Sequence, residues 1–101
     1  MKEKKVLYLT ISKKWFDMIV AGTKNEEYRE IKAYWASRLV ESCDNDELKF
    51  KPYTHVLFIN GYNKESPRIE KKIKDICIGF PKKGLCPNKW LKTRFFIIIF
   101  E

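Results

Sequence analysis

The longest uninterrupted apolar run of this chain is Phe95–Phe100, which consists only of phenylalanine and isoleucine. Successive side chains of a strand point to opposite faces of the sheet, so a strand of this kind needs cover on both faces. The run is far shorter than the about 20 apolar residues of a membrane-spanning helix. We therefore predict a buried strand here that pairs centrally in a sheet.

Two further segments are rich in β-branched and large apolar residues and are predicted to be buried strands. They are Val6–Ile11 and Thr54–Asn60. The second one runs into Asn60-Gly61, a dipeptide typical of turns. A shorter strand is predicted over Asn25–Glu30, where Glu27 and Arg29 would share one face.

Two helices are predicted between these strands. The first follows Ser12, which suits a helix N-cap, and ends at Gly22, which suits a left-handed C-cap. The second spans Ile31–Val40, where apolar residues recur at helical spacing. The polar or proline-containing stretches are predicted to be loops, namely Ser42–Pro52 and Phe80–Asn88.

The segment Ile69–Ile78 is ambiguous from its residues alone. Ile69, Ile73 and Ile76 follow a helical period, and Ser66-Pro67 suits a helix start. The isoleucines are β-branched, however, which favours a strand. Periodicity by itself slightly favours a helix.

The length of 101 residues predicts a single domain over residues 1–101. The three cysteines, Cys43, Cys77 and Cys86, are widely spaced and form no CxxC pair, and His55 is the only histidine. This set favours neither a zinc site nor a disulfide framework, so we expect no metal and no cofactor. With no signal-peptide pattern, a cytoplasmic protein is the plain expectation.

Positive charge is concentrated in the second half of the chain. Residues 1–50 carry 10 basic and 9 acidic side chains, whereas residues 51–101 carry 11 basic and 4 acidic ones, for a net charge of +8 overall. Clustered basic charge is the electrostatic footprint of a nucleic-acid binder, although many basic proteins bind no nucleic acid. The charge indicates a class of partner but does not identify a reaction. We expect no membrane partner.

The residues after the first predicted helix carry more charge than packing requires. Gly22, Lys24, Glu27 and Arg29 occur within eight positions. Lysine and arginine suit phosphate or carbonyl oxygens, and a glutamate can accept from the exocyclic amine of a base. The motif therefore indicates a ligand site, while ion pairing of Glu27 with Arg29 or Lys24 that merely fixes the turn remains the structural alternative.

The spacing of these four residues resembles the signature of the ASCH family of PUA-like domains: Gly, any residue, Lys, two residues, Glu, any residue, Arg. The order of the later segments agrees, with Phe58-Ile59-Asn60-Gly61-Tyr62, then a basic segment ending in Ile76-Cys77-Ile78-Gly79, then the final apolar strand. The resemblance implies an α+β fold, a small and highly curved PUA-like β-barrel with two or more packed helices. It would make Ile69–Ile78 a barrel strand and place the signature along a cleft beside the first helix.

Members of this family are thought to bind RNA or modified nucleosides, and a few are enzymes. One bacterial group hydrolyses the acetyl group of N4-acetylcytidine with the signature lysine, here Lys24, and a threonine three residues later. This chain has Glu27 at that position, and a carboxylate cannot replace the attacking hydroxyl. The resemblance therefore implies a binding module more than this amidohydrolase.

The candidate site residues fall into two groups. The expected ligand-binding residues are Gly22, Lys24, Glu27, Tyr28, Arg29, Asn60, Tyr62 and Arg68. The residues expected to steer a nucleic-acid backbone are Lys13, Lys14 and Lys64. Tyr28, Tyr62 and Trp35 offer faces on which an unstacked base could lie, with core packing as the alternative for Trp35. Trp15, Trp35 and most phenylalanines are expected in the core.

Three functions are compatible with these observations. The first is an RNA- or modified-nucleotide-binding module without catalysis of its own. The second is a small enzyme on nucleosides or RNA, an amidohydrolase or a ribonuclease, in which Lys24 and Glu27 would act as an acid–base pair. The third is a protein-interaction domain whose basic face meets an acidic partner. The sequence leaves the oligomeric state open.

Overall fold

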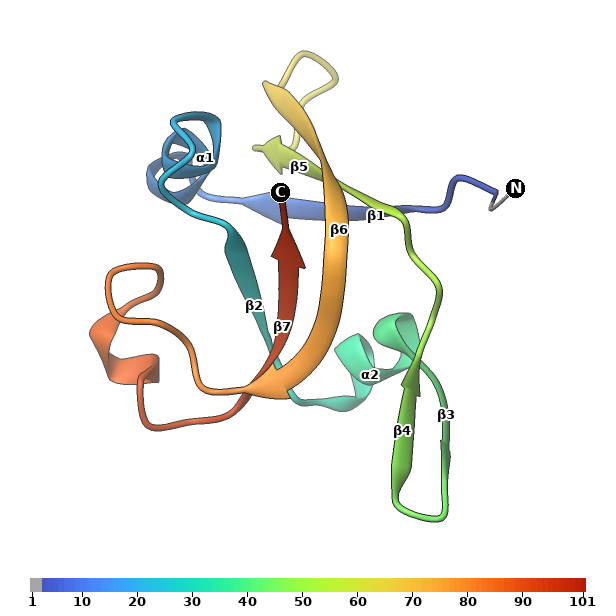
Figure 1. Ribbon diagram of the computed structural model, residues 1–101. Coiled ribbons are helices and arrows are strands. Elements are labelled where there is room, and N and C mark those ends of the chain that lie inside the picture. The colour runs from blue at the N-terminus through green and yellow to red at the C-terminus, as the bar shows by residue number, and fades with distance from the viewer. Residues whose placement is uncertain (1–2) are drawn as a thin grey trace.

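The computed structural model describes residues 3–101 as one five-stranded mixed sheet with helices and a separate hairpin around it (Figure 1). The strand order is β1-β5-β6-β7-β2. Only β1 and β5 run parallel, and the other neighbours are antiparallel. The strands span Val6–Ile11 (β1), Glu26–Glu30 (β2), His55–Asn60 (β5), Arg68–Gly79 (β6) and Phe95–Phe100 (β7).

The apolar run forms β7, which pairs with β6 on one side and β2 on the other. Its even-numbered residues, Phe96, Ile98 and Phe100, belong to the main core, whereas Phe95 and Ile97 belong to a second cluster on the opposite face. The prediction of a centrally paired strand is confirmed. The second cluster is covered by the segment between β6 and β7, which supplies Cys86.

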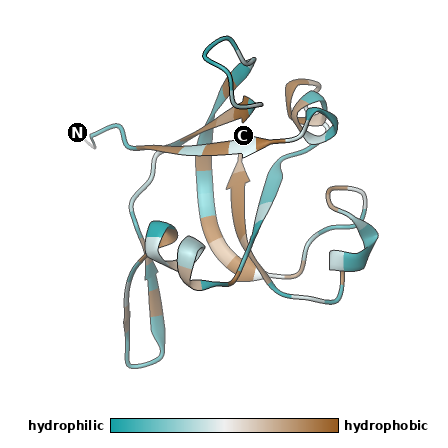
Figure 2. Ribbon diagram, turned by 180° about the vertical axis from the view of Figure 1, so that it is seen from behind, coloured by the Kyte–Doolittle hydropathy of each residue, from teal (hydrophilic) through white to brown (hydrophobic). Residues whose placement is uncertain are grey.

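Residues 3–101 also form two α-helices and one short 3-10 helix, with bounds Lys13–Val20 (α1), Ala33–Leu39 (α2) and Asn88–Trp90 (η1). Phe16 and Ile19 of α1 and Leu39 of α2 are buried in the main core. Figure 2 shows the apolar strands at the centre of the molecule and hydrophilic segments around them. Both predicted helices are confirmed, with the second one shorter than its predicted range.

The prediction of a loop over Ser42–Pro52 is wrong, because most of this segment forms an antiparallel hairpin of β3 (Val40–Asp44) and β4 (Glu47–Phe50). Asn45 and Asp46 at its tip have φ of 50° and 65°. Asparagine and aspartate tolerate this left-handed conformation and suit the tight turns of hairpins. The strands are mostly exposed and polar, so the apolar alternation that identifies a strand is missing.

The helical period over Ile69–Ile78 is misleading, because β6 is one long strand of 12 residues. It pairs with β5 through its first half and with β7 through its second half. A register shift between Ile73 and Asp75 leaves Lys74 as an extra residue, which is a β-bulge. Ile69, Ile73 and Ile76 all pack in the main core, and the extra residue between Ile73 and Ile76 turns an even spacing into one of three, so their spacing mimics a helix. The strand implied by the family resemblance is present.

The sheet curls strongly, and β1 runs across the direction of β7 in Figure 1. Strands β1 and β2 are nevertheless the two edges of the sheet, and the described residues show no ladder between them. A compact α+β fold is therefore present, whereas the closed barrel implied by the resemblance is not confirmed. Among residues 3–101, no helix has the length and apolar character needed to cross a membrane.

Candidate functional site

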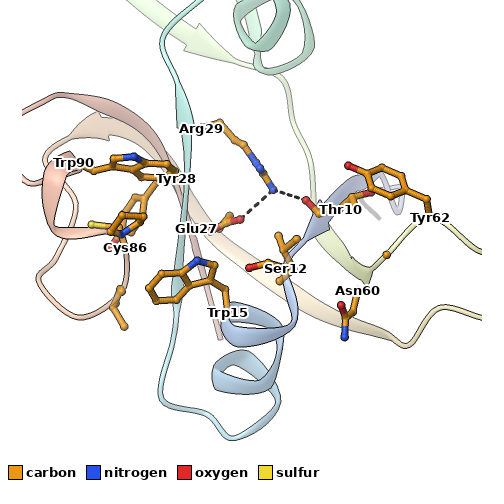
Figure 3. Close-up of a pocket in the computed structure, with 14 residues that line it drawn as sticks. Thr10, Ser12, Trp15, Glu27, Tyr28, Arg29, Asn60, Tyr62, Cys86 and Trp90 are labelled. Carbon is orange, nitrogen blue, oxygen red and sulfur yellow. Dashed lines mark hydrogen bonds and ion pairs between the residues drawn. The ribbon is translucent and has the colours of Figure 1, made fainter.

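A pocket of about 400 Å³ lies beside the gap between the two edge strands. Its walls come from the end of β1, the start of α1, the middle of β2, the turn after β5 and the segment 85–90 (Figure 3). Two motif residues, Glu27 and Arg29, and Tyr28 between them meet Asn60 and Tyr62 in its lining, together with Thr10, Ile11, Ser12, Trp15, Gly61, Leu85, Cys86, Pro87 and Trp90. Five segments that are distant in sequence thus share one concavity.

Gly22 shapes this site from outside the pocket. Its N–H donates to the Ile19 carbonyl and the Thr23 N–H donates to the Met18 carbonyl, which is the Schellman arrangement at a helix C-terminus. Its φ of +81° is readily adopted only by glycine. The turn ends α1 and directs the chain inward, so that Lys24 is buried at the start of the next segment.

Glu27 is the centre of a buried ionic cluster. Its Oε1 lies 3.3 Å from Nζ of Lys24, and its Oε2 lies 3.0 Å from Nη2 of Arg29. All three side chains are mostly buried, and the Glu27 side chain is 9% exposed. One carboxylate therefore holds two cations, each on its own oxygen. This is the ion pairing that the sequence left open, and the cluster borders the pocket (Figure 3).

Lys24 lies beneath the pocket rather than in its lining. Its ammonium donates to the Leu85 carbonyl at 2.6 Å, and it lies 4.8 Å from the ring centre of Tyr28 and 5.2 Å from that of Trp15. Burial lowers the pKa of Lys24, and the Glu27 carboxylate partly offsets this effect. The lysine thereby ties the segment 85–90 to β2 and α1, and it supports the pocket wall.

Arg29 joins the two edges of the sheet across the pocket. Its Nη2 donates to the Thr10 carbonyl of β1 at 3.2 Å as well as to Glu27 of its own strand. The guanidinium lies 5.0 Å from the ring centre of Trp35, within the range of a cation–π contact. Its Nε is buried and has no hydrogen-bond partner among the described residues. This atom is enclosed by the protein and does not face the open pocket.

Tyr28 is almost fully buried, with 1% of the residue exposed. Its hydroxyl donates to Glu26 Oε1 at 2.9 Å and accepts from the Lys82 N–H at 3.1 Å. Burial raises the pKa of Tyr28 strongly, and the Glu26 carboxylate adds to this effect. Most of the ring is therefore packed away, so Tyr28 contributes to the pocket floor and offers no open face for a base.

The opposite wall of the pocket is open to solvent. Asn60 ends β5, and Gly61 after it has a φ of +111°. A methyl group on Gly61 would lie 3.0 Å from Oγ of Ser66, so the turn is also closely packed. Tyr62 follows and is 94% exposed, and its ring stands at the pocket rim in Figure 3. An aromatic side chain this exposed is free to contact a ligand.

The remaining predicted residues do not line this pocket. Lys13 pairs with Asp17 one turn along α1, and the Lys14 ammonium lies 4.6 Å from the ring centre of Trp15. Lys64 lines a shallow depression in the turn after β5, and Arg68 begins β6. These cations lie on the elements that flank the site. The predicted backbone contacts of the three lysines and the predicted ligand contact of Arg68 stay predictions.

Sequence reasoning missed the segment 85–90, which supplies a quarter or more of the lining. Cys86 is buried beneath the pocket, and Trp90 stacks on Phe95 with ring centres 4.8 Å apart. Trp15 was expected in the core and is only partly buried. A tryptophan in a proline- and glycine-containing loop was the available signal, because loops on a rigid sheet often form binding sites.

The chemistry of the pocket favours recognition of a planar polar molecule. Trp15 and Trp90 supply aromatic surface, while Arg29 and Asn60 supply donors and acceptors. Burial raises the pKa of the Cys86 thiol, although Lys24 acts in the opposite direction. A protonated thiol is a poor nucleophile. Residues 3–101 bring together no group of three His, Cys, Asp or Glu side chains that could hold a metal ion.

Comparison of the chain with models of protein families, with curated proteins and with solved structures gave no match.

Proposed function

We propose that this chain is a PUA-like module of the ASCH type that binds RNA or a modified nucleotide with one base in the pocket beside Glu27 and Arg29. The proposal rests on one observation: Glu27 and Arg29 of the motif line a pocket whose lining also contains Trp15, Trp90 and Asn60. A base offers both a flat face and edge acceptors, so it suits this combination better than a purely apolar molecule does.

The volume of the pocket agrees with the binding of a single nucleotide. Ligand pockets typically have volumes of about 300–1,000 Å³, and this one has about 400 Å³. Glu27 is already engaged by two cations, so its role in the free protein is to position Arg29. Arg29, Asn60 and the tryptophans are the residues that would contact the base, with Tyr62 covering it from the rim.

Tyr62 allows a test that leaves the fold intact, because its side chain is almost fully exposed. Nucleoside monophosphates, N4-acetylcytidine and a short single-stranded RNA would be titrated while tryptophan fluorescence is recorded. Removing one stacking ring typically costs about 1–3 kcal/mol, so Tyr62→Ala should weaken binding about fivefold to a hundredfold. Tyr8→Ala, which also removes an exposed tyrosine but lies outside the pocket, should bind as the wild type does.

Equal affinities for the Tyr62→Ala and Tyr8→Ala variants would contradict a base at this rim. No fluorescence change and no binding with any of these ligands would contradict the proposed function as a whole.

The enzyme alternative is favoured by one observation, the lowered pKa of Lys24 beside Glu27. Lowered lysine pKa values occur in general bases. Here the ammonium is engaged by the Leu85 carbonyl and lies outside the pocket lining, so the geometry favours binding over proton transfer. Incubation with N4-acetylcytidine and with RNA, followed by product analysis, separates the two functions, since only an enzyme yields product.

A further inference from the structure

A second concavity lies between the hairpin and the bent strand β6, and its lining shares no residue with the pocket beside Glu27. We call it the lysine groove. Its volume is about 490 Å³, and it is lined by residues of β4, of the segment that follows β4, and of the middle of β6. In Figure 1 the hairpin lies at the lower right and the segment 85–90 at the left, with β6 running between them.

Four lysines line the lysine groove, namely Lys49, Lys51, Lys72 and Lys74, against one carboxylate, Asp75. Lys49 lies in β4 and Lys51 follows it, whereas Lys72 and Lys74 both lie in β6. Asp75 accepts from the Ile76 N–H, which occupies one of its oxygens. The groove therefore carries a strong excess of positive charge.

The four cations differ in how far they are engaged. The ammonium of Lys51 donates to the Ser37 carbonyl, and Lys49 forms an exposed pair with Glu41 at 3.3 Å. Within residues 3–101, Lys72 and Lys74 have neither an ion pair nor a side-chain hydrogen bond shown by the structure. Lys72 and Lys74 are thus the cations available to an external anion.

The β-bulge in β6 contributes to this arrangement. Lys74 is the extra residue of the bulge, and both Lys74 and Asp75 are exposed, which breaks the alternation of the strand. Bulges turn side chains away from the direction that a regular strand gives them and are frequent near binding sites. The bulge places a second unengaged lysine beside Lys72 at the mouth of the groove.

The floor of the groove is aromatic and apolar between these cations. Phe50 and Tyr53 line it, and the Lys5 ammonium lies 5.0 Å from the ring centre of Tyr53. Aromatic side chains within a basic groove are the arrangement of proteins that bind single-stranded nucleic acid, in which cations contact the backbone and bases contact rings. An acidic peptide offers charge to the lysines but no planar face to these rings.

We propose that the lysine groove binds the phosphodiester backbone of single-stranded nucleic acid, with Lys72 and Lys74 as its main phosphate contacts. This inference deepens the proposed function, because it makes a strand rather than a free nucleotide the ligand. It does not depend on what the pocket beside Glu27 holds, since the two linings are separate.

The test measures how binding depends on salt, because each phosphate contact to a single strand contributes about 0.7 to the slope of log affinity against log salt. A fluorescein-labelled oligouridylate would be titrated by anisotropy against the wild type and against the double variant Lys72→Gln/Lys74→Gln. The slope of the variant should be smaller by about 1.4. Between about 50 and 200 mM salt, the factor by which its affinity falls should therefore be about sevenfold smaller than that of the wild type.

The matched control is Lys83→Gln/Lys92→Gln, which removes the same charge from exposed positions that line neither cavity. It should keep the wild-type slope. Thermal unfolding of all three proteins checks the fold, and Lys49→Gln provides a second groove variant on the other strand with a slope change of the same sign.

Three results would overturn the assignment. The first is no binding of the oligouridylate by the wild type at low salt, and the second is an equal slope for the groove variant and the control. The third is that the groove variant loses binding to polyglutamate or to phosphatidylserine vesicles as much as it loses binding to the oligouridylate. That result would show a site for any polyanion. Titration of the Tyr62→Ala variant with nucleosides tests the pocket beside Glu27 separately. Failure of base binding in that pocket can therefore be distinguished from failure of backbone binding in the lysine groove.

Discussion

At the scale of single residues, the site depends on the Glu27 carboxylate, whose two oxygens pair with two different cations. Glu27 holds Lys24 on one oxygen and Arg29 on the other, and each cation then reaches a backbone carbonyl on a different segment, Leu85 or Thr10. Removing one member of a buried ionic group leaves the others uncompensated. The motif therefore joins three parts of the chain in addition to any role in binding.

Lys24 should make stability depend on pH in a defined direction. Because burial lowers its pKa below 10.5, the unfolded chain binds more protons than the folded one between that lowered pKa and about 10.5. The free energy of unfolding should therefore rise with pH in this interval. Lys24→Met removes this contribution and leaves the Leu85 carbonyl without its donor, which costs about 1–3 kcal/mol.

Urea denaturation of the wild type and of Lys24→Met at several pH values measures this effect. The difference in free energy of unfolding between them should widen as the pH approaches 10.5. Lys92→Met is the control, since Lys92 is exposed and its replacement should change stability by less than about 0.5 kcal/mol. A difference that narrows with rising pH would contradict the assigned direction.

At the scale of elements, the sequence predicts those helices and strands whose surroundings stay the same along their length, because their hydrophobic pattern then has a single period. Phe95–Phe100 is buried on both faces, and its unbroken apolar run indicates this directly. Strand β6 changes partner along its length and contains a bulge, so no single period describes it. Strands β3 and β4 are held by their turn and by each other while facing solvent, and they show no apolar alternation.

The connection from α1 to β2 was predictable because its conformation requires a particular residue. Gly22 has a φ of +81°, and a side-chain methyl group placed there would meet no atom within 4 Å. Gly22→Ala should therefore destabilise the protein by backbone strain alone, about 1–2 kcal/mol. For a domain of this size, each kcal/mol corresponds to a melting temperature lower by roughly 4–8 °C.

Gly22→Asn is the informative comparison, because asparagine adopts the left-handed region more readily than alanine does. Thermal unfolding should rank the wild type highest, Gly22→Asn next and Gly22→Ala lowest. Equal melting temperatures for the two variants would show that the φ value is not the cause of the loss.

At the scale of the whole molecule, the sequence predicts some of the residues that share the pocket, but it does not predict whether the edges of the sheet pair with each other. The motif placed Glu27 and Arg29 on one face of a strand, and the structure has both in the pocket lining with Asn60 and Tyr62. The segment 85–90 joins them through long-range contacts, among them that of Lys24 with the Leu85 carbonyl, between residues 61 positions apart. Such a contact leaves no periodic pattern in the sequence.

The gap between β1 and β2 is crossed by a side chain, since Arg29 of β2 donates to the Thr10 carbonyl of β1. If this contact holds the two edges together, Arg29→Met should loosen both edge strands while the centre of the sheet stays protected. A hydrogen bond from a charged group contributes about 1.5–3 kcal/mol, so amide protection should fall about tenfold to a hundredfold in the edge strands.

Hydrogen exchange followed by mass spectrometry provides the measurement, with peptides covering β1 and β2 compared against peptides covering β6 and β7. Arg38→Met is the matched control, because Arg38 also lies against an aromatic ring, that of Tyr34, yet belongs to α2 and joins no strands. Uniform loss of protection across all strands would indicate global destabilisation. Faster exchange confined to β1 and β2 would show that one arginine holds the sheet at the mouth of the pocket, where a ligand contacting the same side chain would stabilise the entire fold.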